Sequence, residues 1–393
     1  MPTPPAPRRL HEHPMPDRAA GALLGPLVAA ALVGVPPRQA AHLATTITTP
    51  PPTPTPDPDH LAHLLRFALH QGHTPHHPPT APIARTWAQA LHTLVHTRTP
   101  PTTAPELEHT PTTDPHSASW QALTHTPYPP HEPAHGSFAC THLTRAIHAA
   151  HRAGGHQAAL YTGALTGARW GASALPLQAL RRVSEHTDPH TLTRTALDLI
   201  TPTPDPHAWP HTPLRSEDGL NPPTFAVAHP LDPHVLLGNL AYLRSRPDHV
   251  DAVVSLCRTH PHDAPHLAGP DWIRVWLHDT PDANTNVHFT LDQAADAVAT
   301  LRAEGKRVLV HCWAGASRTP AVATRYAITA LDAPPLQTMA TMIRTVGGHL
   351  DNPSLSRAVA DLSGLDLPDP AQTLFDGRLP PRRPDLHQHR TRR

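Results

Sequence analysis

A cysteine and an arginine six positions apart are the residues of this chain best placed to do chemistry. In the run RVLVHCWAGASRTPAVATRYAITAL, an apolar stretch leads into His311 and Cys312, five residues follow, and Arg318 and Thr319 then begin a helical pattern. A strand, a short loop and a helix N-terminus in this order direct backbone N–H groups into one concavity, which suits a dianionic phosphate. The helix dipole and the Arg318 guanidinium both favour the thiolate of Cys312. The pattern therefore predicts a nucleophilic cysteine facing a phosphoryl group.

The planar guanidinium of Arg318 can grip two phosphoryl oxygens and follow the charge that develops on them during transfer. Gly315 lets the loop turn tightly. The alternative interpretation is a buried structural cysteine beside an arginine that caps a helix. The loop glycine, the hydroxyl after the arginine and the preceding strand together favour the catalytic interpretation.

These residues resemble the signature of the cysteine-dependent phosphatases, and residues 235–362 resemble the dual-specificity branch of the protein tyrosine phosphatases. The resemblance includes Leu237 and Gly238 in the first strand, and Asn352 and Pro353 near the end. It implies an α/β domain with a central sheet. It also implies hydrolysis of phosphomonoesters through a phosphocysteine, with no metal and no cofactor.

The same resemblance implies a role for each residue of the signature. Cys312 is then the nucleophile, Arg318 the phosphate clamp, and His311 the residue that orders the loop by hydrogen bonding. Thr319 stands where the family has a hydroxyl that helps to expel the thiolate. The backbone N–H groups expected to bind phosphate are those of Trp313, Ala314, Gly315, Ala316, Ser317 and Arg318.

The mechanism also needs a general acid, because expelling an unprotonated oxygen raises the barrier. The segment WIRVWLHDTPDANTN offers Asp279 and Asp282 after a strand-like run, some thirty residues before Cys312, where the family keeps its acid. Asp279 is preferred because it follows the strand immediately, and Asp282 is the alternative. If neither carboxyl reaches the leaving group, the same loop predicts a module that binds phosphate without turnover.

The expected partner is a phosphorylated protein, bearing phosphotyrosine or phosphoserine/threonine, or another phosphomonoester. The loop contains no lysine of the kind that suggests highly anionic phosphoinositides. The chain has 31 basic and 31 acidic residues, and this zero net charge argues against a nucleic-acid-binding surface.

Changes in the hydrophobic pattern and composition divide the chain of 393 residues into two domains with flanking segments. Helical periodicity fills the first 200 residues, and short β-branched runs alternating with helical segments follow, which indicates an all-α and an α/β domain. The runs expected to be helices are 59–71, 83–97, 140–152 and 191–200, and those expected to be strands are 235–238, 252–256, 273–277 and 308–310. The predicted limits are a disordered tail at 1–16, a helical domain at 17–201, a Pro-rich linker at 202–223, an α/β domain at 224–366, and a basic Pro-rich tail at 367–393 that is a disordered end or a docking arm.

Three cysteines cannot build a disulfide framework, which favours a reducing compartment and a cytoplasmic protein. The uncharged run at 19–35 could be a signal sequence or a membrane anchor. It falls short of a membrane span and contains a central proline, so a buried first helix capped by Asp17 is preferred, with no membrane partner. The 36 histidines are interpreted as compositional, and their clusters at 73–77 and 260–266 are not expected to bind metal.

A second resemblance concerns the helical half. The run DRAAGALLGPLVAAALVG resembles the opening helix of the ADP-ribosylglycohydrolases, and AIHAAHRAGGHQAALYTGALTGARWGASALP resembles their late glycine-rich helix region. That family binds magnesium through clustered aspartates, whereas here Gly154 and Gly155 are followed by His156 and Gln157. The resemblance therefore implies a catalytically dead copy that binds an ADP-ribose-like ligand or a protein, or that docks on the α/β domain. The alternative function for the whole chain is an ADP-ribose-binding or ADP-ribosyl hydrolase protein whose helical half sets its activity.

Overall fold

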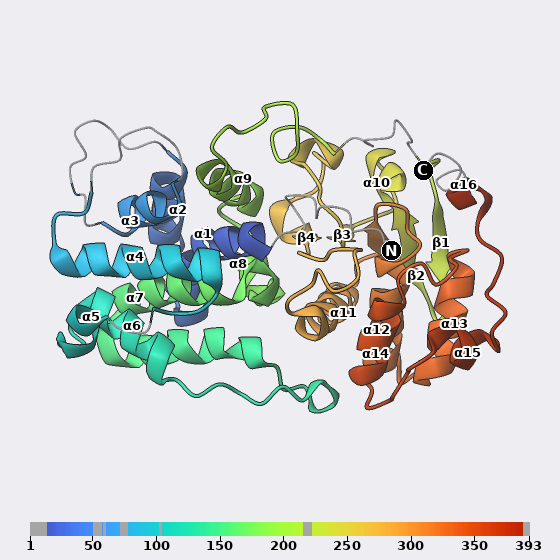
Figure 1. Ribbon diagram of the computed structural model, residues 1–393. Helices are drawn as coiled ribbons and strands as arrows, with labels where there is room; N and C mark the ends of the chain where they lie inside the picture. Colours follow the sequence, from blue (N-terminus) through green and yellow to red (C-terminus); the bar gives the residue numbers. More distant parts are fainter. Residues whose placement is uncertain are drawn as a thin grey trace, which may run out of the picture. The chain divides into compact units, whose positions relative to one another are not determined.

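The computed structural model describes residues 14–49, 57, 60–70, 78–101, 104–214 and 222–387. Within these residues the chain forms two compact units (Figure 1). The helical unit comprises Met1–Pro127, His142–Leu175 and Thr191–Pro204, and the sheet unit comprises Tyr128–Thr141, Pro176–His190 and Asp205–Arg393. The histidines at 73–77 and most of the segment 48–59 lie outside the described residues.

The units alternate along the chain, unlike the consecutive domains that the sequence predicts. Phe138 packs edge-on against Phe289 with ring centroids 5.6 Å apart, and Arg181 pairs with Glu304. Leu177, buried in the same unit, donates its backbone N–H to Gln293. Segments 128–141 and 176–190 therefore belong with the sheet unit, because their apolar and charged side chains find their partners there.

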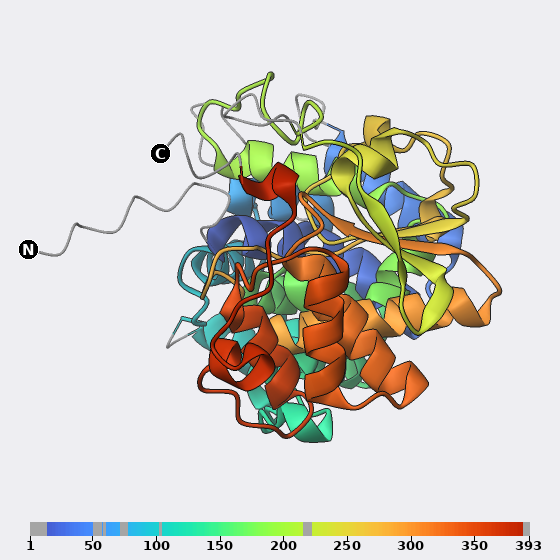
Figure 2. The ribbon, with the colours of Figure 1, turned by 90° about the vertical axis from the view of Figure 1, so that its right-hand side faces the viewer.

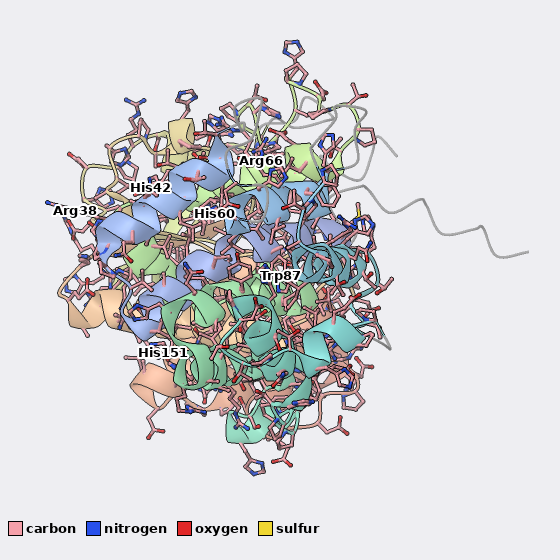
Figure 3. All side chains as sticks on the ribbon, turned by 90° about the vertical axis from the view of Figure 1, so that its left-hand side faces the viewer. Arg38, His42, His60, Arg66, Trp87 and His151 are labelled. Carbon is pink, nitrogen blue, oxygen red and sulfur yellow. The ribbon has the colours of Figure 1, made fainter. Side chains whose placement is uncertain are left out.

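Helices make up the helical unit, and each predicted helical run in it is confirmed. Its helices are α1 (Pro14–Val33), α2 (Pro37–Thr48), α3 (Leu61–Leu69), α4 (Pro82–Thr97), α5 (Pro105–His109), α6 (Pro115–His125), α7 (His142–Trp170), η4 (Ala172–Ala174) and α9 (Pro189–Ile200), the last from Thr191 onward. Trp87 of α4 is fully buried and donates its indole N–H to Ser119. Arg38 and His42 project from the exposed face of α2 (Figure 3).

Glycines allow α1 and α7 to pack with their backbones in contact. A Cβ on Gly25 would lie 2.0 Å from the carbonyl oxygen of Gly163, and one on Gly21 would lie 2.2 Å from that of Gly167. No side chain larger than hydrogen fits at such a distance. These four glycines, which lie in the two runs that predict an ADP-ribosylglycohydrolase-like domain, thus have a packing role in this chain.

α1 is the core helix of its unit. By length and composition alone it could cross a membrane, and 83% of its most apolar window is buried in the protein. It begins at Pro14, so Asp17 lies inside its first turn and is not the cap that the sequence predicts. The Asp17 carboxylate instead accepts hydrogen bonds from the backbone N–H (2.8 Å) and hydroxyl (2.7 Å) of Ser173 in η4. Burial raises the pKa of Asp17 to about 6.

Gly25→Ala is expected to destabilise the protein by about 1–3 kcal/mol, because the added methyl group overlaps the Gly163 carbonyl and separates the helices. Helix propensity alone would favour alanine by about 1 kcal/mol. Urea unfolding followed by circular dichroism measures the change. Gly34→Ala is the control: its Cβ meets nothing within 4 Å, and only the left-handed backbone there carries a cost. An unchanged or higher stability for Gly25→Ala would contradict the packing described.

A five-stranded sheet forms the centre of the sheet unit, in the order β1-β2-β5-β3-β4. β1 is antiparallel to β2, and the other neighbours are parallel. The strands predicted at 235–238, 252–256 and 308–310 are confirmed, whereas the strand predicted at 273–277 ends at Arg274, and β1, which the sequence did not signal, is added. The strands are β1 (Ala226–His229), β2 (Asp232–Asn239), β3 (Ala252–Ser255), β4 (Trp272–Arg274) and β5 (Val308–Cys312).

Every residue of β3 and β5 is buried, as expected for strands covered on both faces. On one face, Val253 and Leu309 pack with Leu240 and Leu243 of α10. α11 contacts β3 and β5, and α12 contacts β2 and β5. The helices of this unit are α8 (Leu177–Val183), α10 (Leu240–Arg244), α11 (Val287–Ala303), α12 (Arg318–Leu331), α13 (Pro335–Thr345) and α14 (Pro353–Asp361), with α15 (Pro370–Phe375) and α16 (Pro384–His387) at the end.

The two predicted tails differ from the structure in part. Residues 14–16 belong to α1, and the remainder of 1–16 lies outside the described residues. Residues 367–387 fold against the sheet unit and include α15 and α16, with Leu374, Phe375 and Leu386 buried. Figure 2 shows this segment in red beside the orange helices. Burial of these apolar side chains is why the segment is ordered despite its prolines.

Candidate active site

Cys312 lies at the carboxyl end of β5, between β2 and β3, and only 1% of its surface is exposed. Residues 313–317 form the loop that follows, and α12 begins at Arg318. Gly315 has a φ of +75°, and a Cβ there would lie 2.7 Å from the carbonyl oxygen of Gly238. Glycine is therefore required at position 315 for two reasons: the left-handed backbone conformation and the close contact with β2.

Arg318 is held beside Cys312 by backbone carbonyls from two neighbouring strand ends. Its Nη1 donates to the carbonyl oxygens of Leu256, at 2.8 Å, and Leu277, at 3.1 Å. Burial opposes the charged form of this guanidinium, but the neighbouring Asp279 and Cys312 outweigh that effect and raise the pKa of Arg318. A fixed cation thus lies next to the thiol, where it can stabilise negative charge on sulfur or on a bound anion.

Three buried side-chain donors cluster at the start of α12. Within the described residues, the hydroxyls of Ser317 and Thr319 and the Nε of Arg318 have no hydrogen-bond partner. An unsatisfied buried donor costs about 1–3 kcal/mol. An oxyanion held at this helix N-terminus would accept such hydrogen bonds, so the site is built to receive one.

His311 belongs to a hydrogen-bond relay that fixes its tautomer. Trp272 donates its indole N–H to Ser255 Oγ at 2.9 Å, and the same Oγ lies 2.6 Å from His311 Nε2. The Cys312 carbonyl oxygen, 3.4 Å from Nδ1, can only accept, so Nδ1 carries the proton of the neutral ring and Nε2 accepts from the Ser255 hydroxyl. Burial, aided by the positive charge of Arg318, lowers the pKa of His311 to about 4. The histidine is neutral and holds the backbone of the cysteine.

The loop that follows β4 brings Asp279 beside Arg318. Its carboxylate lies 3.6 Å from Arg318 Nη2, and 43% of its side chain is exposed. Asn352 Nδ2 donates to the Asp279 backbone oxygen at 2.6 Å. Asn284 closes the loop by two hydrogen bonds to the backbone of His278. The loop is thus tied down on both sides of the carboxylate.

Asp282 occupies a different position from Asp279. It is exposed and has a φ of +60°, in the left-handed region typical of a turn. The structure therefore brings Asp279, and not Asp282, to within salt-bridge distance of Arg318.

The remaining cysteines and the loop tryptophan have packing roles. Trp313 packs against the core cluster around Leu240. Cys140 and Cys257 are buried, and burial raises the pKa of Cys257 to about 12. Among the described residues, no group of three or more His, Cys, Asp or Glu side chains is arranged to hold a metal ion.

The comparisons with known proteins agree with this geometry. Residues 245–346 match the family model of the dual specificity phosphatase catalytic domain. This phosphatase-like segment contains Cys312, Arg318, Asp279 and the Ser255 relay, whereas β2 and Asn352 lie beyond its limits. A search of the curated proteins found no match.

Sequence reasoning missed the partners that hold the signature residues. Ser255 and Trp272 reach His311 only through the parallel register of β3 with β4 and β5, in which Ser255 is paired with His311. Asn352 belongs to the resemblance near its end, but its bond to the Asp279 backbone spans 73 residues and leaves no local signal. One signal in the sequence could have pointed to the relay. Ser255 is the polar last residue of the otherwise apolar strand β3.

The neutral state of His311 predicts a specific pH dependence of stability. Because its pKa falls from 6.5 to about 4 on folding, the unfolded chain binds the extra proton, and stability is lost as the pH drops from about 6.5 to about 4. In His311→Asn the titrating imidazole is absent, so this loss of stability at low pH is absent too. The difference in unfolding free energy between wild type and His311→Asn should therefore shrink by up to about 3 kcal/mol between pH 7 and pH 4. Urea titrations at several pH values test this, and a constant difference would show that His311 is not held neutral.

Proposed function

We propose that the sheet unit hydrolyses phosphomonoesters through a phosphocysteine formed on Cys312, as a protein tyrosine or dual-specificity phosphatase. The observation that carries the proposal is the position of Cys312 beside the fixed guanidinium of Arg318, with Asp279 3.6 Å from that guanidinium. The match of residues 245–346 to the dual specificity phosphatase catalytic domain supports it independently.

In the first step, the thiolate of Cys312 attacks phosphorus and the bond from phosphorus to the ester oxygen breaks. Arg318 and the N–H groups of residues 313–318 bind the equatorial oxygens, on which charge develops. The leaving oxygen takes a proton from Asp279. The products of this step are the alcohol or phenol and the phosphocysteine.

In the second step, water attacks phosphorus and the bond to sulfur breaks, which releases inorganic phosphate. Asp279, now ionised, accepts a proton from that water, so the enzyme returns to its starting state. The Thr319 hydroxyl, which is buried beside the loop and has no partner within the described residues, donates to the departing thiolate. His311 stays neutral throughout and keeps the loop in place.

The substrate class proposed is a phosphorylated protein bearing phosphotyrosine or phosphoserine/threonine. The absence of lysine from residues 313–317 supports a substrate of modest charge. A cytoplasmic location is part of the same proposal and rests on the small number of cysteines.

The alternative, in which the helical unit sets the function, stays a prediction. A groove of about 640 Å³ between α6 and α7 is lined in part by Arg145, His148 and Arg152, and this charge would suit an anionic ligand of the ADP-ribose kind. The described residues of the unit offer no acidic cluster for magnesium. Binding or docking is therefore the role proposed for it, without catalysis.

Cys312→Ser is expected to abolish hydrolysis of p-nitrophenyl phosphate, because a serine hydroxyl at this position is not ionised and cannot form the phosphothioester. Cys257→Ala, two residues beyond the end of β3, is the matched control and should retain activity. EDTA should have no effect on the wild type. Release of p-nitrophenolate measures all three, and full activity of Cys312→Ser would refute the proposal.

Two substrates that differ in leaving-group ability can show whether Asp279 or Asp282 is the general acid. Asp279→Asn should lower kcat by about 10²- to 10⁴-fold on phenyl phosphate, whose phenolate needs a proton. It should lower kcat far less on p-nitrophenyl phosphate, because nitrophenolate leaves readily. Asp282→Asn should stay near the wild-type rate on both substrates. The opposite ranking of the two variants would assign the acid to Asp282.

A further inference from the structure

The C-terminal segment places an arginine against the outside of the phosphate loop. Arg383 donates from Nη2 to the carbonyl oxygen of Ala314 at 2.7 Å and from Nη1 to that of Val346 at 2.9 Å. Its backbone N–H donates to Gly347 at 2.8 Å. The contact with Ala314 joins two positions that are 69 residues apart in the chain.

Arg383 is fixed in this position by a second set of contacts. Asp385 accepts from its Nε at 2.6 Å and from its Nη2 at 3.1 Å, and both side chains are nearly buried, at 12% and 11% exposed. The guanidinium carbon lies 3.5 Å from the centre of the Phe225 ring. A bidentate, largely buried pair of this kind has a defined geometry, unlike a surface ion pair.

The peptide that Arg383 contacts is the one in the loop best able to turn over. Gly315 follows it, with a φ of +75°, and glycine accepts either sign of φ at little cost. A peptide followed by glycine can therefore rotate between two orientations, as type I and type II turns do. Because the peptide is planar and trans, the Ala314 oxygen and the Gly315 N–H point in opposite directions.

We propose that Arg383 is a positioning residue of the phosphate loop: by holding the Ala314 carbonyl outward, it keeps the Gly315 N–H turned inward to bind the phosphoryl group. This inference rests on the proposed function, because it assumes that residues 313–318 bind phosphate. It gives the C-terminal segment a role in the site, where the sequence predicts a tail or a docking arm.

Binding of inorganic phosphate by calorimetry tests the inference without turnover, in the full chain carrying Cys312→Ser. Adding Arg383→Met should raise the Kd for phosphate about tenfold, because one inward donor is lost for part of the time. In the background of Cys312 itself, Arg383→Met should lower kcat/KM for p-nitrophenyl phosphate by a similar factor. Arg378→Met removes an exposed arginine of the same segment and should change neither value.

The comparison is made at a temperature where circular dichroism shows each variant to be folded. A purely structural contact would lower the unfolding midpoint and leave the phosphate Kd of the folded protein unchanged, and that result would overturn the inference. If Arg383→Met does not fold, Arg383→Lys takes its place. The three contacts use three different guanidinium nitrogens, whose positions a single ammonium nitrogen cannot all occupy. A Kd about threefold higher is therefore expected, and an unchanged Kd overturns the inference.

Two proteins without a change at Arg383, the wild type and Cys312→Ser (the parent), distinguish failure of the proposed function from failure of this inference. If Cys312→Ser binds no phosphate and the wild type hydrolyses no phosphomonoester, the site itself is wrong and the inference falls with it. If the parent binds phosphate and Arg383→Met binds it equally well, only the role of Arg383 is wrong.

Discussion

The Arg318 guanidinium donates hydrogen bonds to the backbone carbonyl oxygens of Leu256 and Leu277. These carbonyls follow β3 and β4, so one side chain ties two strand ends to the loop after β5. Burying a cation is costly unless its donors and its charge are satisfied. Here the carbonyls, Asp279 and Cys312 offset that cost, and the position of each of these groups depends on the others.

Two further supports hold the same loop from different sides. Within the sheet, Trp272 and Ser255 fix the neutral ring of His311 against the backbone of Cys312. Outside it, Arg383 contacts the carbonyl of Ala314. A loop that presents N–H groups to an anion must turn its carbonyls away, and each of these contacts engages a carbonyl. The polar groups are preorganised, which is the condition for electrostatic stabilisation of a transition state.

In the helical unit, the spacing of glycines in α1 and α7 has a structural cause. Gly25 and Gly163 lie where two helix backbones touch, and Gly21 and Gly167 repeat the contact one turn away. These glycines lie within the two runs from which the sequence predicts an ADP-ribosylglycohydrolase-like domain, and the matched family model, at residues 245–346, lies outside both runs. Close packing of α1 against α7 explains them without any catalytic role.

The sequence by itself determined most of the elements and the residues of the signature, because a strand, a loop and a helix N-terminus are local and Cys312, Gly315 and Arg318 lie within seven positions of one another. It did not signal β1, α15 or α16, and it predicted the general acid as Asp279 or Asp282. Only the tertiary structure decided that Asp279 faces Arg318, that Ser255 reaches His311, and that the C-terminal segment returns to Ala314. These contacts follow from strand register and from the path of the chain, and residues so far apart in sequence leave no periodic or local pattern.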